Sequence, residues 1–370
     1  MKEIQNILQK ATKLSVGEKA ILATVVDVVG SGYRRPGARM LIDENGYSIG
    51  TVSGGCLEAD VLERAKKVLE TGEPAVITYD TTQDENSVFG LSMGCRGIVR
   101  ILLEPFEKES FLLRVLQIAT ERRERQFIGT LVSSNNNSLI GGRIFYDDLE
   151  QFNFKSLPNV LESSKELLLD CEKFFGQNDL SEAREYKIGE NTFEIFFENI
   201  NPPLNLLLFG AGYDALPLIK FAKEIGWRVM AIDHRPAFAN AERLTEADEV
   251  IVASSENLND EIFQDENSVG VVMTHNYERD RNILRRLLHS KCKYVGALGP
   301  KKRTEKLLEE IGEKFSADQL EKLHAPIGLD IGADSPEAIA LSIIAEIQSV
   351  LKSRNGGFLR ERKGSIYERN

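Results

Sequence analysis

The sequence predicts an α/β protein, with an N-terminal mixed α/β domain followed by a doubly wound parallel sheet. Residues 204–210, LNLLLFG, form a nearly continuous apolar run, which is typical of a strand buried on both faces of a parallel sheet. Further apolar runs follow as WRVMAID, DEVIVAS, VGVVMTH and KYVGALG, with helical stretches between most of them. Strands that alternate with helices in this way predict a doubly wound sheet.

The first 200 residues have a different pattern, in which short strands are grouped around single helices. We expect a helix over about 2–13, followed by strands at Ala20–Val29, Arg39–Asp43, Tyr47–Val52, Ala75–Tyr79 and Gly97–Leu103. A second helix follows Cys56, because apolar residues recur there at helical spacing, and Gly72 is placed to end it. The apolar residues of that helix are Leu57, Val61, Leu62, Ala65, Val68 and Leu69.

Residues 107–200 predict more α/β structure but contain no legible motif. The expected elements are helices at Phe111–Arg122 and Leu161–Phe174 and strands at Phe127–Ser133, Gly142–Tyr146 and Thr192–Phe197.

A chain of 370 residues is too long for one ordinary core, so we expect two domains. Consecutive prolines at 202–203 favour an extended linker, so we place the domain boundary there. The predicted domains are 1–200, with its main motifs in 15–106, and 201–354, followed by a flexible tail at 355–370.

Composition and charge exclude several classes of protein. The net charge is −11 and the cations are spread along the chain, which disfavours a nucleic-acid-binding surface. No window approaches 18 uninterrupted apolar residues, so we expect no membrane span. The start of the chain lacks the apolar middle of a signal peptide, which predicts a cytoplasmic location. The four cysteines form no C-x-x-C pair, which disfavours structural zinc and a disulfide framework.

A glycine-rich turn marks the candidate ligand site of the second domain. Residues 210–215, GAGYDA, match G-x-G-x-x-G/A, including Gly210 and Gly212, between a buried strand and a helix. This Rossmann-like arrangement lets backbone amides and a helix N-terminus approach a phosphate. Asp233 ends the next strand, where a carboxylate accepts hydrogen bonds from a ribose. The alternative is a sheet that keeps the turn without its ligand.

Three more side chains belong to this candidate site. His234 and Arg235 directly follow Asp233, and Arg235 is placed either to bind an extra phosphate or simply to lie in solvent. His275 follows the VGVVMTH strand, at the carboxyl edge where α/β proteins bind their ligands. It is either a ligand contact or proton donor, or a structural histidine.

Three glycine-rich segments in the first domain carry arginine or cysteine. Residues 30–39, GSGYRRPGAR, bring Arg34 and Arg35 into a flexible loop that suits an anion, or forms a basic surface hairpin. Residues 53–58, SGGCLE, include Gly54, Gly55, Cys56 and Glu58, and residues 94–97, GCRG, include Cys95 and Arg96. A helix start stabilises a thiolate, so Cys56 is a candidate reactive thiol. Either cysteine is alternatively a small buried apolar residue.

The order of these motifs resembles the XdhC/CoxI family of accessory proteins for molybdenum hydroxylases. The resemblance rests on GSGYRRPGARMLI, GTVSGGCLEADV, GLSMGCRGIVRILLEP, PPLNLLLFGAGYDALPL, WRVMAIDHRP and HAPIGLDIGADSPEAIALSIIAEI. It implies a protein that binds molybdenum cofactor, as molybdopterin or its dinucleotide, and delivers it to a xanthine dehydrogenase-type apo-enzyme. For such a delivery protein we expect a homodimer and consider a cysteine desulfurase as a further partner, and the sequence leaves open whether this chain or a separate desulfurase transfers sulfur.

Under this resemblance, the glycine, arginine and cysteine residues named above become cofactor-binding candidates. Cys56, with Cys95 as second choice, would contact molybdenum or its sulfur, since thiolate is a soft metal ligand. The glycine turn would hold a phosphate or nucleotide end, including NAD(P) as one candidate. The alternatives are an NAD(P)-dependent oxidoreductase and a nucleotide-sensing regulatory module. A dehydrogenase needs neither the GGC turn nor the arginine loop, so the front motifs favour a cofactor-binding chaperone over an enzyme.

Overall fold

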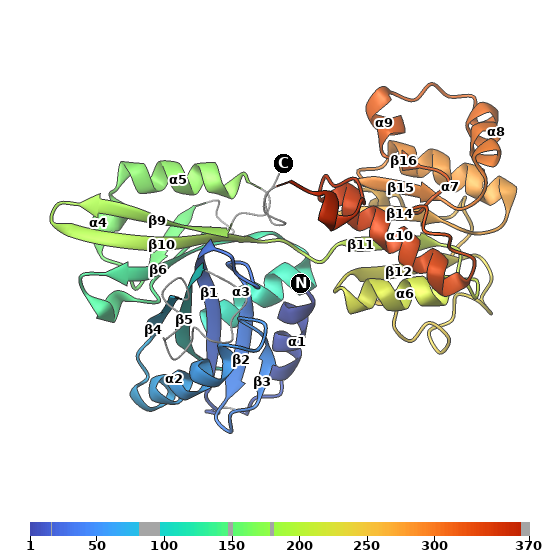
Figure 1. Ribbon diagram of the computed structural model, residues 1–370. Coiled ribbons are helices and arrows are strands. Elements are labelled where there is room, and N and C mark those ends of the chain that lie inside the picture. The colour runs from blue at the N-terminus through green and yellow to red at the C-terminus, as the bar shows by residue number, and fades with distance from the viewer. Residues whose placement is uncertain (16, 81–96, 147–150, 178–180, 364–370) are drawn as a thin grey trace. The chain divides into compact units, whose positions relative to one another are not determined.

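The computed structural model describes residues 1–15, 17–80, 97–146, 151–177 and 181–363 (Figure 1). The chain divides into two compact units. The front unit comprises residues 3–202, and the back unit comprises residues 203–370 together with Met1 and Lys2.

The first sheet of the front unit has five antiparallel strands in the order β3-β2-β1-β5-β4. These strands are β1 (Ala20–Gly30), β2 (Arg39–Asp43), β3 (Ser48–Gly50), β4 (Ala75–Asp80) and β5 (Gly97–Phe106). The helices are α1 (Lys2–Ala11) and α2 (Glu58–Thr71). Helix α2 buries Val61, Ala65 and Val68 against one face of the sheet, as the helical spacing predicted. Gly72 ends α2 in the left-handed conformation and its amide donates to the Val68 carbonyl.

The second sheet of the front unit is also antiparallel, with the order β8-β7-β6-β10-β9. Its strands are β6 (Gln126–Ser134), β7 (Arg143–Tyr146), β8 (Phe152–Lys155), β9 (Ser181–Ile188) and β10 (Asn191–Ile200). The helices are α3 (Phe111–Gln117), α4 (Asn159–Glu162) and α5 (Lys165–Phe175), with a π-helical turn at Ile118–Arg122. The single helix expected at 161–174 is two helices, because Ser164 caps α5 by accepting from the Leu167 amide.

The two sheets of the front unit pack face to face. A small apolar cluster lies between them, formed by Val26, Leu102, Val132 and Phe196. Three ion pairs also join the sheets, namely Arg39–Glu198, Arg100–Glu194 and Arg143–Glu104. Helix α2 covers the outer face of the first sheet, and α4 and α5 cover the outer face of the second.

The back unit contains one parallel sheet with the order β13-β12-β11-β14-β15-β16. The strands are β11 (Asn205–Phe209), β12 (Arg228–Asp233), β13 (Glu249–Val252), β14 (Ser268–Val272), β15 (Tyr294–Ala297) and β16 (Leu323–His324). The helices are α6 (Ala215–Glu224), α7 (Tyr277–His289), α8 (Lys301–Ile311), α9 (Ala317–Glu321) and α10 (Pro336–Leu351). Short 3₁₀ turns lie at Asp260–Phe263 and Leu359–Glu361 in this unit, and at Asn137–Leu139 in the front unit.

Helices cover both faces of this sheet (Figure 1). One core contains Leu206 and Leu208 of β11 with residues of α6 and α10, and the other contains Leu207 and Phe209 with residues of α7 and α8. Neighbouring residues of β11 therefore face opposite cores, which confirms the strand buried on both faces and the doubly wound sheet. Among the described residues, no helix is long and apolar enough to cross a membrane.

Candidate functional site

The glycine turn follows β11, the strand at which the strand order of the parallel sheet reverses. Strand β11 has β12 on one side and β14 on the other, and the turn at 210–215 leads directly from β11 into α6. Gly210 has φ 109°, and a Cβ built there would collide with the Met273 carbonyl beyond β14. The amides of Gly212 and Tyr213 donate to no other residue within the described part of the chain. Ligands of doubly wound sheets bind at this position, and free amides at a helix start suit an anion.

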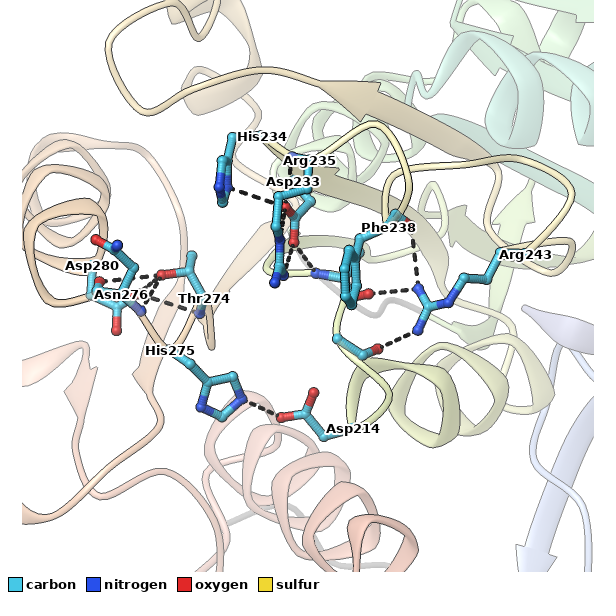
Figure 2. Close-up of polar contacts among 12 residues, drawn as sticks. Asp214, Asp233, His234, Arg235, Phe238, Arg243, Thr274, His275, Asn276 and Asp280 are labelled. Atoms are coloured by element: carbon cyan, nitrogen blue, oxygen red, sulfur yellow. Dashed lines mark hydrogen bonds and ion pairs between the residues drawn. The ribbon is translucent and has the colours of Figure 1, made fainter.

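Arg243 holds the turn through two of its backbone carbonyls. Its guanidinium donates to the carbonyl of Ala211 at 2.6 Å and to that of Gly212 at 3.0 Å (Figure 2). The same guanidinium lies 5.0 Å from the ring centre of Tyr213 and 5.3 Å from that of Phe238. The turn is therefore fixed by a side chain that lies well beyond it in the sequence, which no sequence motif identified.

Asp233 lies beside the turn, and each of its two carboxylate oxygens accepts two hydrogen bonds. Oδ2 accepts from the Ala211 amide at 2.9 Å and from Arg235 Nη2 at 2.8 Å. Oδ1 accepts from the amide and Nε of Arg235, each at 2.9 Å (Figure 2). Burial raises the pKa of Asp233, but these hydrogen bonds outweigh it and lower that pKa to about 2. A ribose hydroxyl would therefore have to replace Arg235 on this carboxylate.

His234 and Arg235 both contact the Asp233 carboxylate. The His234 Nδ1 atom lies 3.2 Å from Asp233 Oδ1, while the Arg235 guanidinium stacks 3.8 Å from the centre of the Phe238 ring. Burial, and then the positive charge of Arg279, lower the pKa of His234. The lowered pKa favours the neutral ring, which offers one donor and one acceptor nitrogen.

His275, three residues beyond β14, and Asp214, five residues beyond β11, are in contact with each other. The His275 Nε2 atom lies 2.7 Å from Asp214 Oδ2 (Figure 2). His275 has φ 56°, in the left-handed region, and its side chain is 62% exposed. Asp214 occupies the N-cap position of α6, yet its side chain makes no capping hydrogen bond. The sequence pattern placed His275 at this edge but gave no indication that Asp214 is its partner.

In the front unit, the GGC turn is organised by Ser53 and Glu58. The Ser53 hydroxyl donates to one oxygen of Glu58, and the Ser53 amide donates to the other at 2.9 Å. The amides of Gly55 and Leu57 donate back to the Ser53 hydroxyl. Burial raises the pKa of Glu58, but hydrogen bonds from Ser53 outweigh it and lower that pKa. Glu58 therefore closes the turn as a carboxylate.

Cys56 is exposed on this turn, one residue before the N-cap of α2. Its sulfur lies 3.7 Å from the Ser53 hydroxyl. Cys171 and Cys292 are buried, and burial raises the pKa of the Cys171 thiol to about 12. Of the cysteines in the described residues, Cys56 is thus the accessible thiol. Cys95 and Arg96 lie outside the described residues.

The arginine loop meets the GGC turn through Tyr33. A Cβ built on Gly54 would lie 3.2 Å from the Tyr33 ring, and Gly54 has no positive φ. A Cβ at position 54 would therefore press against this ring. Arg34 forms an ion pair with Glu3 of α1, while Arg35 is exposed.

The predicted site residues form two groups. In the back unit, one edge of the sheet gathers Gly210, Gly212, Asp233, His234, Arg235 and His275. In the front unit, Gly54, Gly55, Cys56 and Glu58 share one turn. Sequence reasoning gave no role to Asp214, Arg243, Ser53 and Glu3. Asp214 and Ser53 lie within the predicted turns themselves, whereas Arg243 and Glu3 act on predicted residues from elsewhere in the chain. The serine three residues before Cys56 is the one that a turn pattern could have indicated.

Comparisons with known proteins agree with this organisation. Residues 206–347 match the XdhC Rossmann domain, and residues 14–80 match the XdhC and CoxI family. A protein from Bacillus subtilis described as a probable xanthine dehydrogenase subunit is 30% identical over 341 residues, covering 89% of this chain and 92% of the relative. The molybdenum cofactor insertion chaperone PaoD from Escherichia coli is 23% identical over 338 residues, covering 91% of this chain and 85% of the relative.

A solved structure extends the comparison to the whole fold. The crystal structure of a xanthine dehydrogenase from Bacillus halodurans matches with a TM-score of 0.77 and 28% sequence identity. The match covers 96% of this chain and 97% of that one, so both units have counterparts in the same order. With this similarity along both units, the chain belongs to the XdhC and CoxI family.

Proposed function

We propose that this chain is an accessory protein that binds molybdenum cofactor and delivers it to a xanthine dehydrogenase-type hydroxylase. The observation that carries the proposal is family membership together with similarity, along nine-tenths of the chain, to a molybdenum cofactor insertion chaperone. Family membership supports a role in cofactor maturation for such enzymes. The proposal adds that the residues described above bind the cofactor and deliver it.

The front unit fits the metal end of the cofactor. Cys56 is an exposed thiol on a glycine turn, and a thiolate is a soft ligand suited to molybdenum or to its sulfur. Tyr33 is 63% exposed and lies against the same turn, which offers an aromatic face beside the thiol. Aromatic faces stack with planar heterocycles such as a pterin.

The back unit fits the phosphate end of the cofactor. The unpartnered amides of Gly212 and Tyr213, within the described part of the chain, lie at the start of α6, where a phosphate or pyrophosphate binds. The cofactor in its dinucleotide form would place its pyrophosphate at this turn. Molybdopterin without the nucleotide would place its single phosphate there.

An NAD(P)-dependent oxidoreductase is the second candidate, and the Rossmann turn is the observation that favours it. Such an enzyme uses the acid at the end of the second strand for the adenosine ribose. Here Asp233 already accepts four hydrogen bonds, three of them from Arg235. This arrangement supports the oxidoreductase less well than it supports a phosphate-binding turn.

Ligand analysis of the purified chain separates the two functions. The full chain is purified under anaerobic conditions from a molybdenum-replete host, and its molybdenum, pterin and nicotinamide contents are measured. We expect molybdenum and pterin to copurify with the protein. Stoichiometric nicotinamide without pterin would overturn the chaperone proposal.

Substitution of Cys56 tests its role in delivery. Cys56→Ala and Cys56→Ser remove the thiol from an exposed turn, so both variants should unfold at the wild-type temperature. Both should fail to activate a xanthine dehydrogenase-type apo-enzyme in a reconstitution assay. Cys56→Ser is the matched control for side-chain size, so an activity retained by both variants would show that the thiol takes no part.

A further inference from the structure

The Asp214 carboxylate lies where a phosphate would approach the glycine turn. In a G-x-G-x-x-G/A turn, the second glycine leaves room for the backbone to approach the pyrophosphate. A Cβ built on Gly212, the second glycine here, would collide with Asp214 Oδ1. The space that Gly212 leaves open is therefore filled by a carboxylate of the chain itself.

His275 holds the carboxylate in this place. An aspartate at an N-cap position ordinarily accepts from the amides of its own helix. Asp214 does not do so, and its Oδ2 atom instead pairs with His275 Nε2 at 2.7 Å. The pair joins the loop after β11 to the loop after β14, and His275 reaches it from a left-handed backbone conformation that few residues other than glycine adopt.

We propose that Asp214 is a built-in competitor for the ligand phosphate, and that the phosphate displaces Asp214 and takes His275 as its own partner. This inference rests on the proposed phosphate-binding role of the turn. It assigns Asp214 and His275 as the residues that determine how tightly the turn binds a phosphate and which ligands it accepts.

The exchange is favourable in both charge and geometry. A phosphate gains the amides of Gly212 and Tyr213, neither of which has a partner in the described residues, together with the positive end of the α6 dipole. The Asp214–His275 contact is a weak obstacle, because it is one side-chain hydrogen bond whose His275 partner is 62% exposed, and such a bond contributes only about 1 kcal/mol net. While Asp214 stays in place, however, its negative charge repels an approaching phosphate.

Pyrophosphate binding to the full chain tests the proposal directly. Inorganic pyrophosphate is titrated into the wild type, Asp214→Asn and Glu309→Gln, and the dissociation constants are measured by calorimetry. Asp214→Asn removes the charge but keeps the shape, so we expect its dissociation constant to fall by about tenfold. Glu309→Gln removes one exposed charge from α8 and should leave the constant unchanged. The gain should shrink in high salt.

A second variant tests the role of His275 in the exchange. Asn adopts φ above zero readily, so His275→Asn preserves the backbone at this position. In the Asp214→Asn background, His275→Asn should weaken pyrophosphate binding by about threefold or more, because the phosphate loses its imidazole partner. No change in that background would overturn the assignment of His275.

The outcomes separate this inference from the proposed function. If the wild type and Asp214→Asn bind pyrophosphate equally well, the competitor inference is wrong while the phosphate-binding turn stands. If neither protein binds pyrophosphate, the turn is not a phosphate site, and both proposals fall. If Asp214→Asn binds pyrophosphate more tightly than the wild type does, both proposals are supported.

Discussion

Replacing Asp233 by asparagine should destabilise the back unit by about 2 kcal/mol at pH 7. The Asp233 side chain is 1% exposed, and its pKa is lowered from 3.8 to about 2 by hydrogen bonds from Arg235 and the Ala211 amide, which outweigh the effect of burial. Each pKa unit corresponds to about 1.4 kcal/mol, so the folded state stabilises the ionised carboxylate by about 2 kcal/mol. Asparagine carries no charge and offers one oxygen instead of two.

The pH dependence of this difference gives a sharper test. A carboxylate with a lowered pKa contributes stability above its unfolded pKa, and this contribution is lost as the pH falls through the folded value. The difference between wild type and Asp233→Asn should therefore be constant from pH 7 to about pH 5 and about half as large at pH 3.

Trp227 makes the measurement specific to one unit of the chain. It is the only tryptophan in the sequence and is buried in the core of the back unit, so its fluorescence during urea unfolding reports on that unit. Glu309→Gln, which removes an exposed charge from α8, is the control. A difference between wild type and Asp233→Asn that stays constant down to pH 3 would refute the linkage argument.

Two further substitutions test how each unit is held together. Arg39→Leu leaves Glu198 buried without its partner between the two sheets, and should lower the unfolding free energy of the front unit by about 3–5 kcal/mol, measured by circular dichroism. Replacing both residues by leucine should recover most of that loss, and a failure to recover would contradict this explanation. Gly210→Ala forces a Cβ against the Met273 carbonyl at φ 109°, so unfolding followed by Trp227 fluorescence should show a loss of at least about 1 kcal/mol. Wild-type stability of this variant would show that the turn has room to move.

The back unit could be predicted well because its signals are local. The apolar run at 204–210 and the glycine turn can each be recognised from the residues of that segment alone. A strand buried on both faces needs apolar residues on both faces, and the run supplies them. In the front unit, β8 and β9 were missed. Their side chains are mostly half-buried, so neither strand shows a continuous apolar run or a strict alternation of burial.

The partners of the site residues could not be predicted, because they come from distant parts of the chain. Arg34 fits an anion-binding loop in the sequence, yet its guanidinium pairs with Glu3, 31 residues earlier. Asp233 fits a ribose contact, yet it binds Arg235 and the turn amide. A motif identifies which chemical group stands at a position, whereas its hydrogen-bond partner depends on tertiary packing.

Under the proposed function the protein must release what it binds, and these internal partners bear on that release. The candidate ligand contacts at Asp214, Asp233 and Arg34 already have partners inside the chain. A ligand that binds there exchanges one hydrogen bond or ion pair for another, so each contact adds little net free energy. Under the proposed function, the internal partners can replace the ligand again when the apo-enzyme withdraws it. Release then needs no group to be left buried and unpaired, which would cost about 1–3 kcal/mol for each one.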